Sequence, residues 1–284
     1  MSNLLPPRAR RRRGTWLRNW RAATGLALLL AIVTAALLAP WLAPYDPLAQ
    51  DLLNRRQPPS PQHLLGLDEL GRDNLSRILY GARLSLRVGL VAVAAALAAG
   101  GLLGAVAGYR GGWTDSLLTS ALDAVQAIPS LLLALVVVTI LGRGLDNVVY
   151  GVALAAVPVY ARLTRAGVLA AKQLDYVLAA RAIGARAPRL LWRHILPACA
   201  VPLLVQAMLG VGTAILEAAG LSFLGLGAQP PAPEWGAMLS QGRGAIFGAP
   251  HIVLYPGLAL ALTVLSFNLL GEALQGALDP HLRR

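Results

Sequence analysis

Charged and aromatic residues are scarce in this sequence. Charged residues make up 13% of its 284 residues, against about 25% in a typical soluble domain, and aromatic residues make up only 6%. Hydrophobic residues nevertheless reach 56%, so the apolar content is mostly Ala, Leu, Val and Gly. Membrane β-barrels carry aromatic girdles, whereas small apolar residues suit helices that pack closely in a bilayer. We therefore expect an all-α integral membrane protein.

Cysteine and lysine are almost absent. The single cysteine, Cys199, excludes an intramolecular disulfide and a cysteine-based zinc site. The four histidines lie far apart and form no H-E-x-x-H motif, so we expect neither a metal site nor a cofactor. The single lysine, Lys172, lies between Ala171 and Gln173, whereas a P-loop needs Gly-Lys-Ser/Thr. The chain therefore carries no motif for ATP hydrolysis, and we expect no catalytic residues and no enzyme activity.

Six apolar stretches are long enough to cross a membrane, which takes about 20 residues of helix. We predict spans over about 22–43, 86–108, 117–141, 147–168, 198–220 and 251–272. The first is longer than a usual signal-peptide core and lacks a clear A-x-A site, so we expect it to be retained. The other segments are a basic tail (1–21), an extramembrane segment (44–85), a loop (169–197) within a five-span core (86–276), and a short tail (277–284).

The distribution of Arg and Lys predicts the orientation in the membrane. With the N-terminus in the cytoplasm, 17 of the 25 basic residues lie on the cytoplasmic side. The positive-inside rule therefore places both termini in the cytoplasm and the 44–85 segment outside. The net charge is +12, and the basic residues cluster between apolar stretches. We therefore expect the chain to lie in a lipid bilayer and not to bind nucleic acid.

The segment over 44–85 changes character at Asp73. Its first part is rich in proline and is predicted to be irregular. After Asp73, a suitable N-cap, apolar residues recur at helical spacing with arginines between them. We predict an amphipathic helix at the outer surface that leads into the second span. Its role is either structural or that of a docking surface for an extracytoplasmic partner.

The second predicted span carries small residues at every fourth position: Ala92, Ala96, Gly100, Gly104 and Gly108. Such a stripe lies on one helix face and lets another helix approach closely. The partner helix belongs either to the same chain or to another subunit, and a position facing a pore also remains open.

The loop over 169–197 is predicted to fold as two short helices joined by a tight turn. Asp175 is a suitable N-cap for a helix over about 176–183. Gly184 suits a left-handed C-terminal cap, and Pro188 suits the first turn of a second helix. Exposed apolar side chains there, namely Ala179, Ala180, Ile183, Leu190 and Leu191, need cover. A partner protein is the favoured cover, and the chain's own spans are the alternative.

Several of these motifs resemble a known family. Ala179-Ala180, Gly184 and Ile195-Leu196-Pro197 resemble the EAA loop of ABC importer permeases. The stretches GLDELGRDNLSRILYGARLSL (66–86), EAAGLSFLGLG (217–227), NLLG (268–271) and LDP (278–280) resemble the C-type subunit of the dipeptide/oligopeptide/nickel group. The resemblance covers about residues 20–282. One departure is Leu178, which stands where the family usually has Glu and can form neither a capping box nor an ion pair.

The resemblance implies a type I ABC importer permease fold with six transmembrane helices in a bacterial inner membrane. It implies a permease subunit of an ATP-driven, binding-protein-dependent importer, for dipeptides or oligopeptides. The implied partners are a second homologous permease, two ATP-binding subunits and an extracytoplasmic solute-binding protein. The coupling loop would then use Asp175, Leu178, Ala179, Ala180, Gly184, Ile195 and Pro197.

Two acidic residues in or near the spans are further candidates for a functional role. Glu217, near the outer end of the fifth span, either faces the pathway, where it could meet a peptide's amino group, or pairs with an arginine or lies among lipid headgroups. Asp123 is expected to be structural and paired with a cytoplasmic arginine.

Two other classes of function compete with a permease. A membrane-embedded enzyme would need convergent catalytic residues, and only Glu217, Asp123 and His251 are present, far apart in sequence. An ion-coupled carrier or channel often uses broken helices, which Pro129 and Pro158 could create. A carrier would transport without ATP, whereas the permease would not.

The orientation predicts which side of the membrane each segment faces. With Cys199 first replaced, a cysteine at Ser60 should react with a membrane-impermeant thiol reagent added outside intact cells. A cysteine at Arg186 should react only after the cells are opened. The reverse pattern would contradict a cytoplasmic N-terminus.

Overall fold

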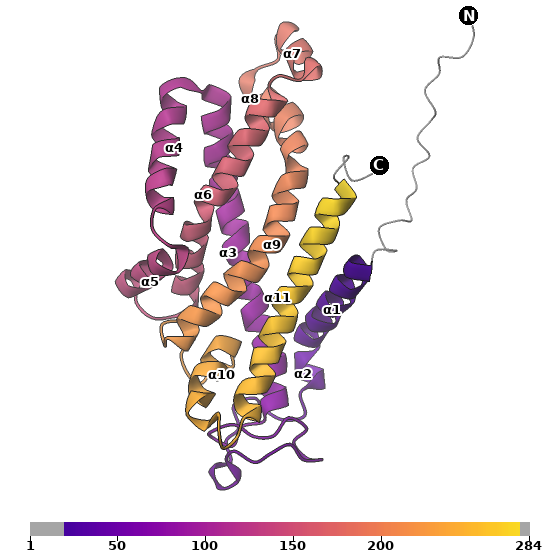
Figure 1. Ribbon diagram of the computed structural model, residues 1–284, viewed down its shortest axis with the longest axis vertical. Helices are drawn as coiled ribbons and strands as arrows, with labels where there is room; N and C mark the ends of the chain where they lie inside the picture. The colour runs from indigo at the N-terminus through magenta and orange to yellow at the C-terminus, as the bar shows by residue number, and fades with distance from the viewer. Residues whose placement is uncertain (1–19, 279–284) are drawn as a thin grey trace, which may run out of the picture.

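The computed structural model describes residues 20–278, and that part of the chain is almost entirely helical. Long helices lie side by side and give the molecule an elongated shape (Figure 1). Within residues 20–278 the β-structure is a single bridge between Leu67 and Asp73. Most of the predicted basic tail (1–21), and the C-terminal tail (277–284) from residue 279 on, lie outside the described residues.

Five helices are long and apolar enough to cross a membrane. They are α1 (Trp20–Leu37), α3 (Asn74–Arg110), α6 (Leu145–Ala171), α9 (Leu196–Phe223) and α11 (His251–Leu278). Each corresponds to one predicted span. A short helix, α2 (Ala39–Leu42), follows α1, which packs against α11 where Gly25 lies beside Leu269 and Leu270.

The third predicted span, 117–141, is wrong as a single continuous helix. The structure has two helices there, α4 (Gly112–Gln126) and α5 (Ser130–Leu141), which meet at 88°. Pro129 lies directly before α5. It has no N–H to donate, and its ring disfavours the helical conformation of the preceding residue. Counted as one bent span, the pair brings the total to six.

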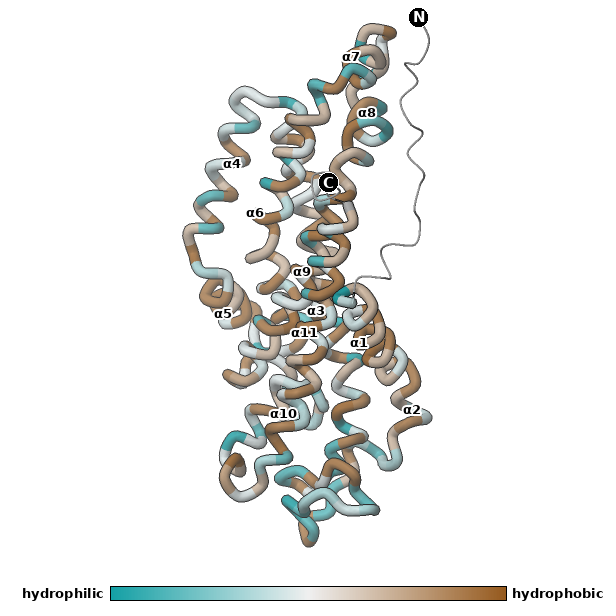
Figure 2. The backbone as a smooth tube through the Cα atoms, turned by 45° about the vertical axis from the view of Figure 1, so that its right-hand side comes forward, coloured by the Kyte–Doolittle hydropathy of each residue, from teal (hydrophilic) through white to brown (hydrophobic). Residues whose placement is uncertain are grey.

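The two ends of the bundle carry the polar and irregular segments. We call residues 172–195, which include α7 (Asp175–Ala182) and α8 (Ala187–Leu190), the tip. We call residues 43–73, together with α10 (Trp235–Gly242), the cap. Tip and cap lie at opposite ends (Figure 1), and hydrophilic residues gather at both, whereas hydrophobic residues dominate the helices between them (Figure 2).

The small-residue stripe of α3 lies against α6 of the same chain. Ala92 and Ala96 are buried, as are Gly100, Gly104 and Gly108. A Cβ at Gly100 would lie 2.5 Å from the carbonyl oxygen of Val157, and one at Gly104 would overlap the carbonyl oxygen of Ala161. Only residues without a side chain at these positions let the two backbones come this close.

This contact predicts that a single methyl group at position 104 is harmful. Gly104→Ala should lower the free energy of unfolding by about 1–3 kcal/mol, as overpacking typically does. The matched control is Gly101→Ala, because a Cβ at Gly101 meets nothing closer than Thr164 Oγ1 at 3.9 Å. The control should be neutral or stabilising, since removing Gly from a helix interior gains about 0.5–1 kcal/mol. Thermal unfolding of the solubilised protein would measure both, and equal effects would contradict the close contact.

Candidate functional site

The tip is a helix–turn–helix unit between two long helices. After α6 the chain forms α7, a turn, α8 and a π-helical turn over Leu191–Ile195 that runs into α9. Gly184 adopts the predicted left-handed conformation, with φ of +84°. The N–H of Ala185 donates to the carbonyl oxygen of Ala180 at 3.1 Å, and that of Gly184 to Arg181 at 3.0 Å. This pair of bonds is a Schellman motif, so Gly184 fixes the angle between α7 and α8.

Asp175 does not have the predicted N-cap role. Leu174 is the cap residue, α7 begins at Asp175 itself, and no side chain hydrogen-bonds to the first turn. A residue in the first helical turn is positioned beyond the N-cap, so its carboxylate cannot reach back to cap the free N–H groups in the usual way. Its negative charge still interacts favourably with the helix N-terminus.

The chain itself covers part of the tip that was expected to need a partner. Leu190 is buried to 1% exposure, so the expectation that it is exposed is wrong. Leu190 and Ile195 pack with Val168, Val177 and Cys199 in a hydrophobic cluster at the base of the tip. Ala180 and Leu191 pack against this cluster and are partly buried.

A set of apolar side chains on the tip nevertheless remains exposed to solvent. Ile183 is 88% exposed and Trp192 is 66% exposed. Leu178 and Tyr176 are about half exposed, and Ala179 is exposed as well. Pro197, the second residue of α9, lies just beyond the tip and is also exposed. These side chains are exposed on a unit whose base packs against the long helices.

Hydrogen bonds attach the tip to α3 and join its two parts to each other. The Lys172 ammonium donates to the carbonyl oxygens of Gly108 and Tyr109 at 3.1 and 2.9 Å. It thereby caps free carbonyl groups in the last turn of α3. The Tyr176 hydroxyl donates to the carbonyl oxygen of His194 at 3.1 Å, which links α7 to the π-helical turn. The first contact joins the start of the tip to α3.

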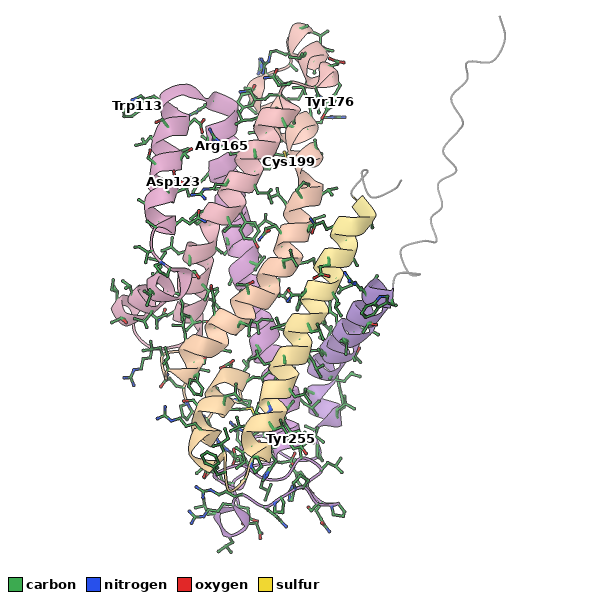
Figure 3. The ribbon with its side chains drawn as sticks, in the orientation of Figure 1. Trp113, Asp123, Arg165, Tyr176, Cys199 and Tyr255 are labelled. Carbon is green, nitrogen blue, oxygen red and sulfur yellow. The ribbon has the colours of Figure 1, made fainter. Side chains whose placement is uncertain are left out.

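Two ion pairs connect α4 to α6. One residue of each pair, Asp123 and Arg165, is labelled in Figure 3. Arg165 donates to both carboxylate oxygens of Asp115 at 2.6 and 2.7 Å. Arg162 donates to Asp123 at 2.6 Å. Asp123 is thus paired with an arginine, and both pairs tie α4 to the helix that carries the tip.

The other predicted acidic residue, Glu217, borders a cavity between α5, α6 and α9. The cavity has a volume of about 190 Å³. Its polar lining residues are Glu217, Ser130, Tyr160, Gln206 and Thr213, and the rest of its lining is apolar or glycine. The Ser130 hydroxyl donates to Glu217 Oε1 at 2.6 Å, so the first residue of α5 is joined to α9.

The cap contains buried charges that the sequence pattern does not reveal. Asp73 caps α3 as predicted, since its Oδ2 accepts from the Ser76 N–H at 2.8 Å. The helix then continues without a break into the membrane span, as predicted. Arg72 and Arg77, expected on a polar face, are 2% and 0% exposed.

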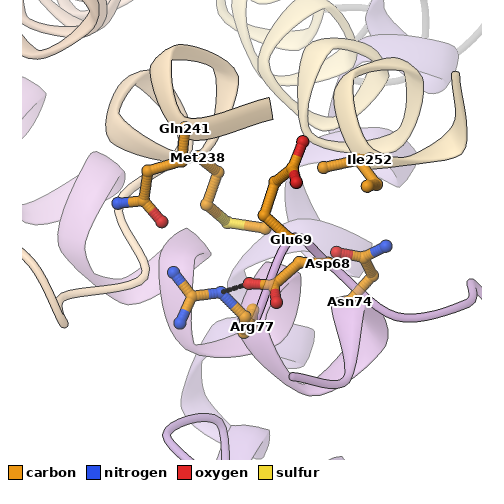
Figure 4. Close-up of a pocket in the computed structure, with 7 residues that line it drawn as sticks. All are labelled: Asp68, Glu69, Asn74, Arg77, Met238, Gln241 and Ile252. Carbon is orange, nitrogen blue, oxygen red and sulfur yellow. Dashed lines mark ion pairs between the residues drawn. The ribbon is translucent and has the colours of Figure 1, made fainter. Parts of the chain in front are cut away.

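Asp68 is the common partner of these two arginines. Arg72 Nε donates to Asp68 Oδ2 at 2.6 Å, and Arg77 Nε lies 3.4 Å from the same oxygen (Figure 4). Arg72 also donates to Gln241 of α10 at 2.7 Å. Arg77 donates to the carbonyl oxygen of Pro47 at 3.1 Å. One carboxylate therefore joins the irregular segment of the cap, the start of α3 and α10.

Within residues 20–278, no group of three or more His, Cys, Asp or Glu side chains is placed to hold a metal ion. The polar features that remain are the exposed tip, the cavity at Glu217 and the buried charges of the cap.

Two protein-family models match this chain. Residues 100–284 match the family described as binding-protein-dependent transport system inner membrane component. Residues 10–59 match the N-terminal transmembrane domain of oligopeptide transport permease C.

Similar proteins cover almost the whole chain. The dipeptide transport system permease protein DppC of Alkalihalophilus pseudofirmus is 46% identical over 94% of this chain and 88% of its own. The di/tripeptide transport system permease protein DppC of Pseudomonas aeruginosa is 49% identical over 93% and 89%. The glutathione transport system permease protein GsiD of Escherichia coli is 45% identical over 95% and 92%.

The buried charges of the cap predict that Asp68 contributes far more to stability than its neighbour Glu69, which serves as the control. Asp68→Ala leaves two buried arginines without their acid and should lower the free energy of unfolding by about 3–5 kcal/mol. Glu69→Ala removes a pair with Arg56, whose side chain is half exposed, and should cost at most about 1 kcal/mol. Thermal unfolding and the amount of protein in the membrane would report both. Similar losses in the two variants would contradict the role of Asp68.

Proposed function

The chain belongs to the family of binding-protein-dependent transport system inner membrane components, and on this premise we propose that it forms part of the import pathway for dipeptides or oligopeptides. Family membership establishes a multi-pass permease of the inner membrane with the type I importer fold. The names of the similar permeases, which refer to dipeptides, di/tripeptides and glutathione, support a short peptide as the substrate.

We propose three kinds of partner protein for this chain. Since the sequence has no P-loop, two ATP-binding subunits would supply the energy. A second permease of similar fold would complete the pathway, and a solute-binding protein would deliver the peptide from outside. Both termini and the tip would then face the cytoplasm, and the cap would face outward, in agreement with the distribution of Arg and Lys.

The observation that carries the coupling role is the construction of the tip. Its exposed apolar side chains offer a surface for an ATP-binding subunit, with Ile183 and Leu178 on it. Its base is fixed by buried packing and by the bonds from Lys172 to the end of α3. A movement of the ATP-binding subunit would therefore reach the long helices. Because Leu178 replaces the usual Glu, this contact would rest on apolar packing at that position.

An ion-coupled carrier or channel is not favoured by the family match. Carriers and channels often contain broken helices. The bend at Pro129 shows that this chain, which belongs to a permease family, contains one too.

The experiment that tests the proposal is uptake into proteoliposomes. The chain would be reconstituted with its second permease, ATP-binding subunits and binding protein, and a labelled dipeptide would be supplied on the binding-protein side. ATP enclosed on the other side should drive accumulation, and omission of ATP or of the binding protein should abolish it. Equal uptake without ATP would contradict the proposal.

The coupling role predicts a specific effect of a change at Gly184. A side chain at its left-handed φ costs roughly 1–2 kcal/mol, and the branched Val costs more, so Gly184→Val should distort the turn between α7 and α8. We expect normal membrane levels, weaker association with the ATP-binding subunits and little transport. Association would be measured by co-purification.

The matched control is Gly225→Val at the opposite end of the molecule. Gly225 has φ of +81°, close to the +84° of Gly184, and a Cβ at either position meets no atom within 4 Å. The control should retain the ATP-binding subunits. Full ATP-driven transport by Gly184→Val, or equal loss of the ATP-binding subunits in both variants, would show that the tip does not couple.

A further inference from the structure

We propose that the cavity between α5, α6 and α9 binds a protonated amino group, that of the transported peptide, with the Glu217 carboxylate as its counter-ion. This inference rests on the proposed transport function and assigns one end of the substrate to one residue. Three observations carry it: the charge of the cavity lining, the partners of Glu217, and the place of Glu217 along α9.

The cavity lining carries a single formal charge. Glu217 is its only ionisable acid or base apart from the phenol of Tyr160, and its other polar groups are a hydroxyl and an amide from Thr213 and Gln206, with the hydroxyl of Ser130. Arginines do occur on α6, but Arg162 and Arg165 line a different cavity with α3 and α4. Both are paired with acidic residues of α4. The field in the cavity therefore favours a cation.

Glu217 keeps capacity for a ligand. In the described part of the chain its hydrogen-bond partner is the Ser130 hydroxyl, which donates to Oε1. A carboxylate has about four acceptor sites on two oxygens, and an ammonium group has three donors. An amino group can thus bind Oε2 without displacing Ser130. A hydrogen bond between two charged groups is stronger than the bond from the neutral Ser130 hydroxyl.

The shape of the cavity suits one end of an extended ligand. Its volume of about 190 Å³ is below the roughly 300–1,000 Å³ of complete small-molecule sites. It runs along α9 from Gln206 to Glu217, a separation of about 16 Å at the helical rise. Glu217 lies six residues from the end of α9 that faces the cap. In the proposed orientation, an incoming peptide would meet Glu217 before Gln206.

The competing explanation is that Glu217 only ties α5 to α9. Glu217→Gln separates the two roles, because a glutamine oxygen still accepts from Ser130 but carries no charge. Ser130→Ala does the opposite, since it removes the bond and keeps the charge. A structural role makes Ser130→Ala the more harmful change, whereas a cation site makes Glu217→Gln the more harmful one.

The charge of the cavity can be measured with thiol reagents of opposite charge. Thr213 is exposed, lines the cavity and lies four residues before Glu217, so the two share one face of α9. Thr213→Cys would be made with Cys199→Ala in the assembled transporter. The rates of modification by a trimethylammonium-ethyl and a sulfonato-ethyl methanethiosulfonate would then be compared. We expect the cationic reagent to be favoured, and Glu217→Gln to lower the ratio of the two rates by about tenfold or more.

The amino group itself is tested by protection. Alanyl-alanine should slow the modification of the cysteine at position 213, N-acetyl-alanyl-alanine should not, and the difference should vanish in Glu217→Gln. Ser130→Ala should keep both the rate ratio and the protection.

Four results would overturn the site: no reaction of the cysteine with either reagent, a rate ratio unchanged by Glu217→Gln, equal protection by the acetylated peptide, or loss of the effects in Ser130→Ala. The transport function has its own separate readout. Selective protection in a transporter that fails ATP-driven uptake would support the amine site while contradicting the proposed function.

Discussion

The close backbone contact between α3 and α6 is the constraint on which the rest of the structure depends. It exists because Gly100, Gly104 and Gly108 present no side chains where the two helices meet. At such a separation the helices cannot slide or rotate against each other without a clash. Both helices end at the tip, where Lys172 joins them, so the orientation of α7 and α8 follows from this contact.

The buried charges at Asp68 fix the other end of α3 in a comparable way. They join the start of α3 to the irregular segment of the cap and to α10. Since α3 runs for 37 residues without a break, it connects the cap to the tip directly. The cavity at Glu217 lies beside this unit, between α6, α9 and the bent helix α5. The tip is thus connected to the cap through α3 and to the wall of the cavity through α6 and α9.

The sequence predicted what depends on local pattern and missed what depends on three-dimensional burial. The length of each apolar stretch predicted the spans, and the need for a left-handed residue predicted the turn at Gly184. The same criterion of length predicted one continuous helix where α4 and α5 are separate, although Pro129 lies at the break. The predicted exposure of Leu190 and Arg77 was wrong for one reason. Whether a side chain is buried depends on helices that are distant in sequence, which periodicity does not reveal. The family resemblance predicted the function, which the family match supports, whereas the roles of individual residues are proposals argued from the geometry.

Since α3 joins the tip to the cap without a break, the account requires that tip and cap move as one rigid unit, and a distance measurement between spin labels tests this claim. Labels at Arg186 and Leu53, which are both exposed, would lie on the tip and the cap, with Cys199 replaced. Pulsed electron paramagnetic resonance would give their separation in the assembled transporter with and without ATP. A rigid unit predicts the same mean distance and width in both states. A shift or a marked broadening with ATP would show that tip and cap move independently.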